Sequence, residues 1–342
     1  MPFANDETNP KAIEITVVAP VRNEESSVRA LLESLLGQSF PPTEIVITDG
    51  GSTDATKAII QEFITAGAPV KLISEEAALP GRGRNIGVQN SSSEWIAFTD
   101  GGNRPAHDWL ESLAAKARGE SPPDLIYGSY SPITDSFFKE CAAIAYVTPP
   151  EEIDGTLARS RSIASALVRR RAWQVVGGFP ENLRSAEDLL FMNAVEQAGF
   201  RVARAPQAIV YWTIQSGFLG TFRRFSVYAR HNLRAGLWRN WQAPILRRYA
   251  VIAVALIPAA IIGLKWLLLP VLLWVGLLLS RAFTALARNR RCYRAGIFRN
   301  LFRLGLIVPI LVTLDAATIN GTIWWLIKDK ISSLIKHGHN PR

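Results

Sequence analysis

The 342-residue chain is poor in the residues that build metal centres and disulfide frameworks. It has two cysteines, Cys141 and Cys292, and four histidines. Two distant cysteines do not make a disulfide scaffold, and no Cys or His spacing typical of zinc ligands is present. These shortages exclude a structural zinc site and favour a reducing compartment, in which unpaired thiols persist.

Acidic residues are missing from a long part of the second half. Residues 1–200 hold 17 Lys and Arg against 27 Asp and Glu, whereas residues 201–342 hold 21 against 2. No acidic residue lies between Gln197 and Leu314. The net charge of +9 therefore hides a negative first half and a strongly positive second half, which predicts that the two halves meet different environments.

Two long apolar stretches lie within the basic half, at 249–280 and 304–327. Each exceeds the roughly 20 apolar residues that a membrane-crossing helix needs. Arginines gather just outside the stretches and tryptophans lie near their ends, as at membrane interfaces. This pattern favours a membrane over nucleic acid, and over two buried helices of a soluble protein. Because arginines stay on the cytoplasmic side, we expect the first stretch to bend near Gly263–Lys265 and return, with one long tilted helix as the alternative.

The first ten residues are polar and acidic, which does not fit a secretory signal. We therefore expect a cell-membrane protein whose N-terminal half is cytoplasmic. The predicted divisions are a polar tail at 1–12, an α/β domain at 13–215, a basic amphipathic segment at 216–248, membrane helices at 249–280 and 304–327 within 249–330, a basic loop at 281–303 between them, and a basic tail at 331–342.

The N-terminal half alternates short β-rich runs with helical patterns. Strands are predicted at 13–19, 44–48, 70–74 and 95–99, and helices at 24–36, 53–65, 83–89 and from about 107. Such alternation is typical of an α/β fold with a mostly parallel sheet covered on both faces. Ligands of these sheets bind at the carboxyl ends of the strands.

Polar motifs follow the strands at that edge. The first is PVRNEE at 20–25, in which Asn23 can cap the next helix. DGGSTD at 49–54 presents Asp49 as an exposed carboxylate for a nucleobase or ribose, and 79–87 resembles a phosphate-binding loop with flexible glycines. DGGNRP at 100–105 offers Asp100 to a divalent cation. Each motif alone also fits an ordinary turn or helix cap, and neither a Walker A loop nor a GxGxxG fingerprint is present.

A further pair of motifs, VGGFP at 176–180 and Glu187-Asp188, follows in order. Together, the motifs resemble those of glycosyltransferase family 2, in a membrane-associated subgroup with C-terminal membrane helices. The resemblance covers roughly residues 13–212. It implies a GT-A (Rossmann-like) mostly parallel sheet flanked by helices, followed by a C-terminal α-helical membrane region. The basic segment 222–232 is similar to the family's QxxRW-type element, without its tryptophan at the expected place.

The resemblance implies an inverting transfer of a sugar from a nucleoside diphosphate sugar, UDP- or GDP-linked, to a membrane lipid or lipid-linked acceptor. Asp188 is the expected base, and Glu187 is expected to position it or the acceptor. Asp100 is the expected ligand of Mg²⁺ or Mn²⁺. The residues expected to bind substrate are Pro20, Asn23, Glu24, Asp49, Arg82, Arg84, Asn85, Asp100, Arg223 and Arg224.

The chain departs from the family pattern at two places. Asp100-Gly101-Gly102 supplies one carboxylate where the family has a DxD-like motif, and the segment 210–212 lacks a histidine that the family often has. A nucleotidyltransferase is disfavoured because no glycine-rich GxGTRxxP-like run follows the first strand. A catalytically impaired, nucleotide-sugar-binding membrane scaffold stays open as the alternative function.

Overall fold

The computed structural model describes residues 13–119 and 121–331. The predicted tail at 1–12, and all but the first residue of the predicted tail at 331–342, lie outside the described residues. The chain divides into two compact units. The first comprises residues up to 130, 161–180 and 191–211, and the second comprises 131–160, 181–190 and the residues from 212 onward.

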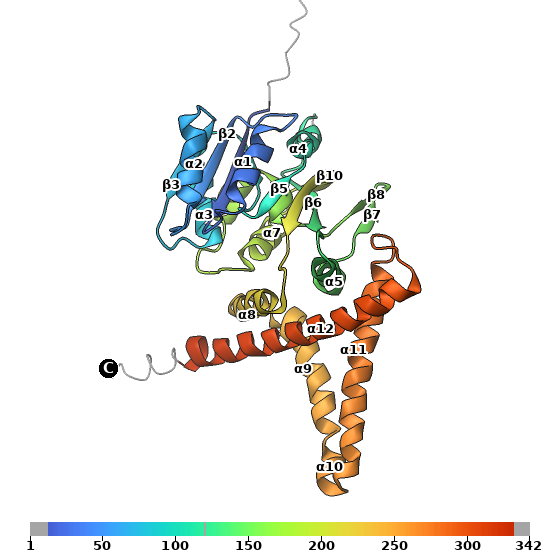
Figure 1. The fold of residues 1–342 in the computed structure, drawn as a ribbon. Helices are drawn as coiled ribbons and strands as arrows, with labels where there is room; N and C mark the ends of the chain where they lie inside the picture. The colour runs from blue at the N-terminus through green and yellow to red at the C-terminus, as the bar shows by residue number, and fades with distance from the viewer. Residues whose placement is uncertain (1–12, 120, 332–342) are drawn as a thin grey trace, which may run out of the picture. The chain divides into compact units, whose positions relative to one another are not determined.

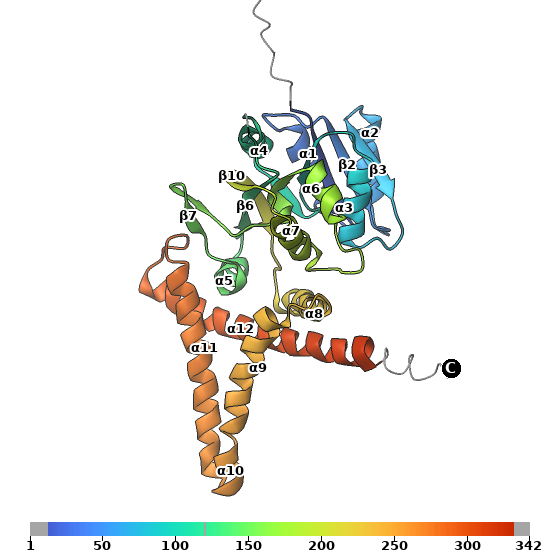
Figure 2. The ribbon, with the colours of Figure 1, turned by 180° about the vertical axis from the view of Figure 1, so that it is seen from behind.

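The first unit is an α/β domain, and its N-terminal part is drawn in blue in Figures 1 and 2. Its strands are β1 (Ile15–Val21), β2 (Glu44–Asp49), β3 (Val70–Ser74), β4 (Trp95–Phe98), β5 (Asn103–Pro105), β6 (Leu125–Ile133), β9 (Ala166–Arg169) and β10 (Val202–Thr213). Its helices are α1 (Val28–Leu36), α2 (Thr56–Thr65), α3 (Pro80–Gln89), α4 (Trp109–Ala117) and α6 (Arg170–Val176), with a 3₁₀ turn η1 at Ile163–Ser165.

The eight strands form one sheet in the order β3-β2-β1-β4-β9-β6-β10-β5. Strands β1 to β4 are mutually parallel, and β9 lies antiparallel between β4 and β6. The strand order moves outward from β1 to β3 and then returns to β4 on the other side of β1. This reversal is the switch point at which ligands of such sheets bind, and it lies where the motifs were predicted.

Alternating residues of β1 divide the core between the two faces of the sheet. Val17 and Ala19 join a buried cluster with Leu31 of α1 and Trp109 of α4. On the other face, a Cβ on Gly87 of α3 would collide with Val18, so α3 packs closely against β1 there. The apolar runs read from the sequence thus make a sheet covered on both faces, as predicted.

The second unit is mainly helical. Its elements are α5 (Phe137–Tyr146), the short hairpin β7 (Glu151–Ile153) and β8 (Thr156–Ala158), α8 (Phe218–Arg234), α9 (Trp238–Val254), α10 (Ile257–Ile261), the 3₁₀ turn η2 (Leu264–Leu267), α11 (Leu268–Arg288), α12 (Ile297–Trp325) and the π-helical turn η3 (Leu326–Ile331). Residues 181–190 add the first turn of α7 (Glu187–Gln197) to this unit.

The first apolar stretch forms a helical hairpin. Helices α9 and α11 contact each other and lie side by side in both views, with α10 at the tip (Figures 1 and 2). The chain reverses at Gly263, whose φ of 136° suits a glycine. The bend expected near Gly263–Lys265 is therefore present. Leu264–Arg288 and Ile297–Ile331 are both long and apolar enough to cross a membrane.

Several predicted boundaries differ from the observed ones. Helix α1 begins at Val28, α2 at Thr56 and α4 at Trp109, because polar turns occupy the residues before them. The predicted basic loop at 281–303 is wrong, since α11 extends to Arg288 and α12 starts at Ile297, which leaves 289–296 as the connection. These helices continue past their apolar runs because Arg281 and Arg303 find buried carboxylate partners, Asp315 and Glu140.

Candidate active site

The ends of β1 and β2 are joined by a dense set of hydrogen bonds. Asn23, with a φ of 55°, donates its N–H to Ser52 Oγ at 2.8 Å, and its Oδ1 accepts the N–H of Thr53 at 2.9 Å. The N–H of Glu24 donates to Thr56 Oγ1 at 2.7 Å. The prediction that Asn23 caps the following helix is therefore wrong, because its side chain reaches across to the motif after β2.

Asp49 ends β2 and is fully buried. Its Oδ2 accepts the N–H groups of Gly51 at 3.1 Å and Ser52 at 3.0 Å. The expectation of an exposed carboxylate is wrong, because the two backbone donors hold the side chain inside the turn. Such a turn is a usual use of aspartate. The assignment of Asp49 to the nucleobase or ribose remains a prediction.

The predicted phosphate-binding loop is a helix. Helix α3 begins at Pro80, a residue suited to a first helical position. Its glycines serve close packing rather than flexibility: a Cβ on Gly83 would lie 2.9 Å from Cβ of Pro20, and one on Gly81 would meet the carbonyl of Pro180. Pro20 itself lies within β1 and packs against α3, whereas its binding of substrate remains a prediction.

Asn85 fastens α3 to the VGGFP motif within the first unit. Its Nδ2 donates to the carbonyl of Phe179 at 2.9 Å, while its Oδ1 accepts the Phe179 N–H at 2.8 Å and Trp173 Nε1–H at 3.0 Å. Asn85 is buried, and Gly178 has a φ of 78° beside it. The structure thus gives Asn85 a role in shaping the site, whereas its binding of substrate remains a prediction.

An arginine–aspartate pair lies at the carboxyl end of β4. Nη2 of Arg84 is 2.7 Å from Oδ1 of Asp100, and the Arg84 side chain is 4% exposed whereas that of Asp100 is 41% exposed. The Arg84 guanidinium also lies 5.4 Å from the centre of the Phe179 ring. A buried cation therefore orients a carboxylate that solvent and ligands can reach. Arg82, by contrast, is exposed and pairs with Glu75.

Glu24 brings a second carboxylate beside Asp100. A Cβ on Gly101 would lie 2.9 Å from Glu24 Cγ, and one on Gly102 would lie 3.7 Å from Glu24 Oε2. Ser27 Oγ donates to the same Oε2. The two glycines of DGGN thus leave room for Glu24 against the turn, which sequence spacing did not indicate.

The chemistry of these oxygens suits Mg²⁺ or Mn²⁺. Within residues 13–119 and 121–331, however, no group of three or more Asp, Glu, His or Cys side chains could hold a metal ion. Among the described carboxylates near this turn, Asp100 and Glu24 are the candidates to hold such an ion together with diphosphate oxygens and water.

Glu187 and Asp188 open α7 and belong to the second unit. Ala186 before them has a φ of 72°, a conformation uncommon for a residue other than glycine. Glu187 is buried, and Asp188 is half-buried with its Oδ1 accepting the Leu189 N–H at 2.8 Å. The neighbouring backbone is held by α8, because the N–H of Arg184 donates to His231 Nδ1 at 3.0 Å.

His231 was missed by the sequence analysis. It is 7% exposed, and burial, with Arg234 and Arg230 nearby, lowers its pKa to about 4. The ring is therefore neutral at pH 7, and Nδ1 can act as an acceptor. A single histidine within a run of arginines gives no spacing signal, so only the fold shows its contact with Arg184.

The two predicted arginines of α8 differ in environment. Arg223 is exposed. Arg224 is half-buried beside Tyr146, and its Nη1 is buried without a hydrogen-bond partner among the described residues. A buried donor of this kind costs stability unless something pairs with it. Arg224 is thus the better placed of the two to receive an anionic group.

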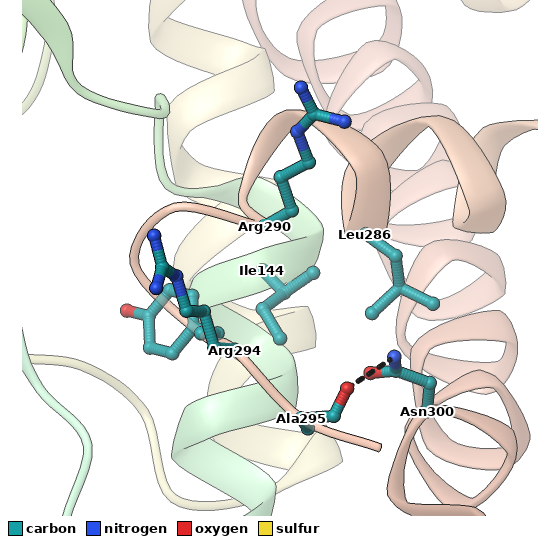
Figure 3. Close-up of a pocket in the computed structure, with 7 residues that line it drawn as sticks. Ile144, Leu286, Arg290, Arg294, Ala295 and Asn300 are labelled. Carbon is teal, nitrogen blue, oxygen red and sulfur yellow. Dashed lines mark hydrogen bonds between the residues drawn. The ribbon is translucent and has the colours of Figure 1, made fainter. Parts of the chain in front are cut away.

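A separate cavity of the second unit lies where α11 ends and α12 begins (Figure 3). Ile144 and Leu286 line its inner part, and the side chains of Arg290 and Arg294 extend beyond them. Asn300 Nδ2 donates to the carbonyl of Ala295 at 3.3 Å and fixes the connection. None of the predicted substrate or catalytic residues lines this cavity.

The chain matches the model of "Glycosyl transferase family 2" over residues 16–176. It is 28% identical over 204 residues to Glycosyltransferase AglE of Haloferax volcanii, covering 57% of this chain and 65% of that protein. It is 24% identical over 370 residues to the Pre-mycofactocin glycosyltransferase of Mycobacterium tuberculosis, covering 93% and 73%. The chain spans between 17% and 65% of the length of three of its curated relatives.

The fold is shared with a solved structure, the mannosyltransferase PcManGT from Pyrobaculum calidifontis in complex with GDP-Man and Mn²⁺. The two align with a TM-score of 0.54 at 20% identity, over 94% of this chain and 89% of that one. The expected fold class is thereby confirmed. Residues 16–176 thus match the glycosyl transferase family 2 model, and the fold of the chain is of the GT-A type.

Proposed function

We propose that the chain transfers a sugar, with inversion, from a UDP- or GDP-linked sugar to a lipid or lipid-linked acceptor at the cytoplasmic face of the cell membrane. The observation that carries the proposal is the Arg84–Asp100 pair, a half-exposed carboxylate oriented by a buried cation at the switch edge of a family 2 domain. Catalysis of this reaction needs an activated acceptor hydroxyl and a stabilised leaving diphosphate.

Asp188 is the proposed base. The acceptor oxygen forms a bond to the anomeric carbon as the bond from that carbon to the diphosphate oxygen breaks, and the hydroxyl proton passes to the Asp188 carboxylate. Asp188 is half-buried at the start of α7. Glu187, buried next to it, is proposed to position Asp188 or the acceptor.

The leaving diphosphate needs positive charge, for which Arg224 is the proposed protein source. Its buried Nη1 has no protein partner among the described residues. In the first unit, Asp100 with Glu24 alongside would hold Mg²⁺ or Mn²⁺. When bound, such an ion neutralises diphosphate charge as a Lewis acid.

The lipid acceptor is proposed from the second unit. Its hairpin exposes a long apolar surface, and no acidic residue lies between Gln197 and Leu314. Arginines flanking apolar segments are attracted to anionic lipid headgroups, each contributing about 1 kcal/mol near the surface.

A thermal-shift experiment tests donor binding. The full-length protein in detergent is heated with UDP or GDP, with and without Mn²⁺, and compared with Asp100→Ala. A ligand that binds the folded state raises Tm. We expect one nucleotide to raise Tm, more so with Mn²⁺, and the Mn²⁺ increment to disappear in Asp100→Ala. No shift with either nucleotide would contradict the proposed donor site.

The single carboxylate of DGGN also favours a second function, an impaired nucleotide-sugar-binding scaffold. This alternative predicts the same Tm shift but no turnover. Measuring nucleoside diphosphate release from UDP- and GDP-sugars in the presence of membrane lipids separates the two functions.

A further inference from the structure

The hairpin and α12 cross each other at one point within the second unit. In both views, α12 runs across the base of the hairpin rather than along it (Figures 1 and 2). Asp315 of α12 is 1% exposed and accepts two hydrogen bonds from Arg281 of α11, at 2.6 and 3.0 Å. Tyr249 of α9 donates to the same carboxylate at 3.1 Å. One buried carboxylate thus ties three helices together at the crossing.

The hairpin has a surface suited to hydrocarbon. Between residues 249 and 280 its exposed side chains are almost all apolar, among them Val251, Ile261, Leu264, Leu268 and Leu272, each at least 62% exposed. Among the described side chains of this stretch, Lys265, beside the tip, is the one that is exposed and basic. A large continuous apolar surface that is not covered by protein marks an interaction surface. The run from Leu264 to Ser280 rises about 24 Å at 1.5 Å per residue. This length is less than the hydrocarbon core of about 30 Å, which favours a hairpin that enters the bilayer and returns over one that reaches the far side.

Helix α12 is long and apolar enough to cross a membrane, but its packing against α8 makes crossing unfavourable. It packs along α8, whose carbonyl at Ser226 lies where a Cβ on Gly321 would be. If α12 crossed the bilayer, α8 would have to follow, although it carries four arginines and a histidine within 17 residues. Charged side chains at the bilayer centre are costly. An orientation in the plane of the interface avoids this cost.

The two faces of α12 agree with that orientation. One face is covered by protein and includes Arg303, which is 3% exposed and pairs with Glu140 of α5. The uncovered residues on both sides of the crossing point are mostly apolar, with Phe298 at 77% and Phe302 at 73% exposed at one end and Ile323 at 47% at the other. Arg299 is the exception, and it pairs with Glu140. Because protein covers the other face, only this exposed apolar strip is free to contact lipid, as expected of a helix that lies along the membrane surface.

Basic side chains lie where the hairpin leaves the interface. Arg290 and Arg294 follow α11 and extend from the cavity of Figure 3, and neither has an ion-pair partner among the described residues. Arg247 precedes the apolar arm of α9 and is exposed. These three arginines, next to an apolar hairpin, are complementary in charge to anionic lipid phosphates.

We infer that the second unit binds an anionic bilayer from one side only. The α9–α11 hairpin enters the hydrocarbon and returns, and α12 lies flat in the interface without crossing. The inference rests on the membrane association of the proposed function but not on sugar transfer. Donor binding and turnover can therefore fail while this topology holds, and the reverse is also possible.

The test uses cysteine labelling in sealed vesicles of known orientation made from cells that express the full chain. Native Cys292 is exposed in the connection between α11 and α12, whereas Cys141 is fully buried. Three single substitutions in a Cys292→Ser background complete the set. Thr65→Cys reports the first unit, Leu264→Cys reports the hairpin tip, and Lys330→Cys reports the end of α12. A membrane-impermeant maleimide is added before or after detergent.

We expect native Cys292 and the Thr65→Cys and Lys330→Cys variants to label from the same side, and the Leu264→Cys variant to label only after detergent. Labelling of the Lys330→Cys variant from the side opposite the Thr65→Cys variant would show that α12 crosses and would overturn the inference. Labelling of the Leu264→Cys variant from the opposite side would show that the hairpin crosses, with the same consequence. Native Cys292 needs no substitution, so it remains informative even if a variant misfolds. Labelling of Cys292 from the side opposite the Thr65→Cys variant, or only after detergent, would overturn the inference.

Discussion

Nδ1 of His231 accepts a hydrogen bond of 3.0 Å from the backbone N–H of Arg184, three residues before Glu187. Burial keeps the imidazole neutral by lowering its pKa to about 4, so the acceptor is present throughout the neutral pH range. Within the second unit, this bond joins α8 to the segment that carries the proposed base. We regard His231 as a positioning residue.

Removing this acceptor is expected to slow transfer without weakening donor binding. One neutral hydrogen bond is worth about 1 kcal/mol, so His231→Ala should lower kcat by about five- to tenfold. His231→Asn places an oxygen near the position of Nδ1 and should restore most of the rate, whereas His231→Gln should not. Steady-state kinetics with a fixed acceptor measures kcat and the donor KM. An equal loss in the Asn and Ala variants would contradict the positioning role.

The same histidine makes stability depend on pH. Its folded pKa of about 4 lies below the ordinary value of 6.5, so the unfolded chain takes up a proton first as the pH falls. The stabilisation is complete above about pH 6.5 and is lost as the pH falls toward 4. Thermal melts between pH 7.5 and 4.5 should therefore show a steeper fall in Tm for the wild type than for His231→Asn. Parallel curves of Tm against pH for the two proteins would contradict the assignment of this pH dependence to His231.

Asp188→Asn is expected to abolish transfer while nucleotide binding stays nearly intact. Asparagine keeps the shape and can still accept the Leu189 N–H, but it cannot take the acceptor proton. A general base contributes about 10²- to 10⁴-fold, which sets the expected loss of kcat. Turnover is compared with the nucleotide-induced rise in Tm. An Asn variant with near wild-type turnover would show that Asp188 only caps its helix.

The neighbouring arginines of α8 form a matched pair. Arg224 has a buried Nη1 without a partner among the described residues, whereas Arg223 is exposed. If Arg224 meets the diphosphate, Arg224→Ala should lower kcat/KM by about 10- to 10²-fold, and Arg223→Ala should lower it much less. Arg224→Lys tests whether charge alone suffices. Losses of equal size in Arg224→Ala and Arg223→Ala would contradict the proposed contact between Arg224 and the diphosphate.

The parallel half of the sheet was predictable because its strands are short apolar runs between turn signals, whereas β5, β6, β9 and β10 were not predicted. The four predicted strands correspond to β1 to β4, and the strand at 70–74 matches β3. The environment of the site residues was not predictable from spacing. Asn85 is fixed by Phe179, 94 residues away, and Asp49 turns back on its own motif. Helix α3 begins at Pro80, but the glycines after it indicated a loop, so the helix was predicted only from Gly83.

In the basic half, too, the sequence pattern did not reveal which helices pack against each other. Apolar length identified the hairpin and α12, and Gly263 indicated the bend. Whether an apolar helix crosses a membrane depends on what packs beside it. For α12 this neighbour is α8, which a hydropathy pattern does not reveal.

The most direct test of the central proposal is transfer of radiolabelled sugar into lipid. Full-length protein in liposomes containing a polyprenyl phosphate is incubated with UDP- and GDP-linked sugars, and label in the organic phase is counted beside Asp188→Asn. We predict that label from one donor enters the lipid phase with the wild type and not with the variant. Absence of labelled lipid with every UDP- and GDP-sugar, in protein whose Tm still rises with a nucleotide, would contradict the proposed lipid glycosyltransferase.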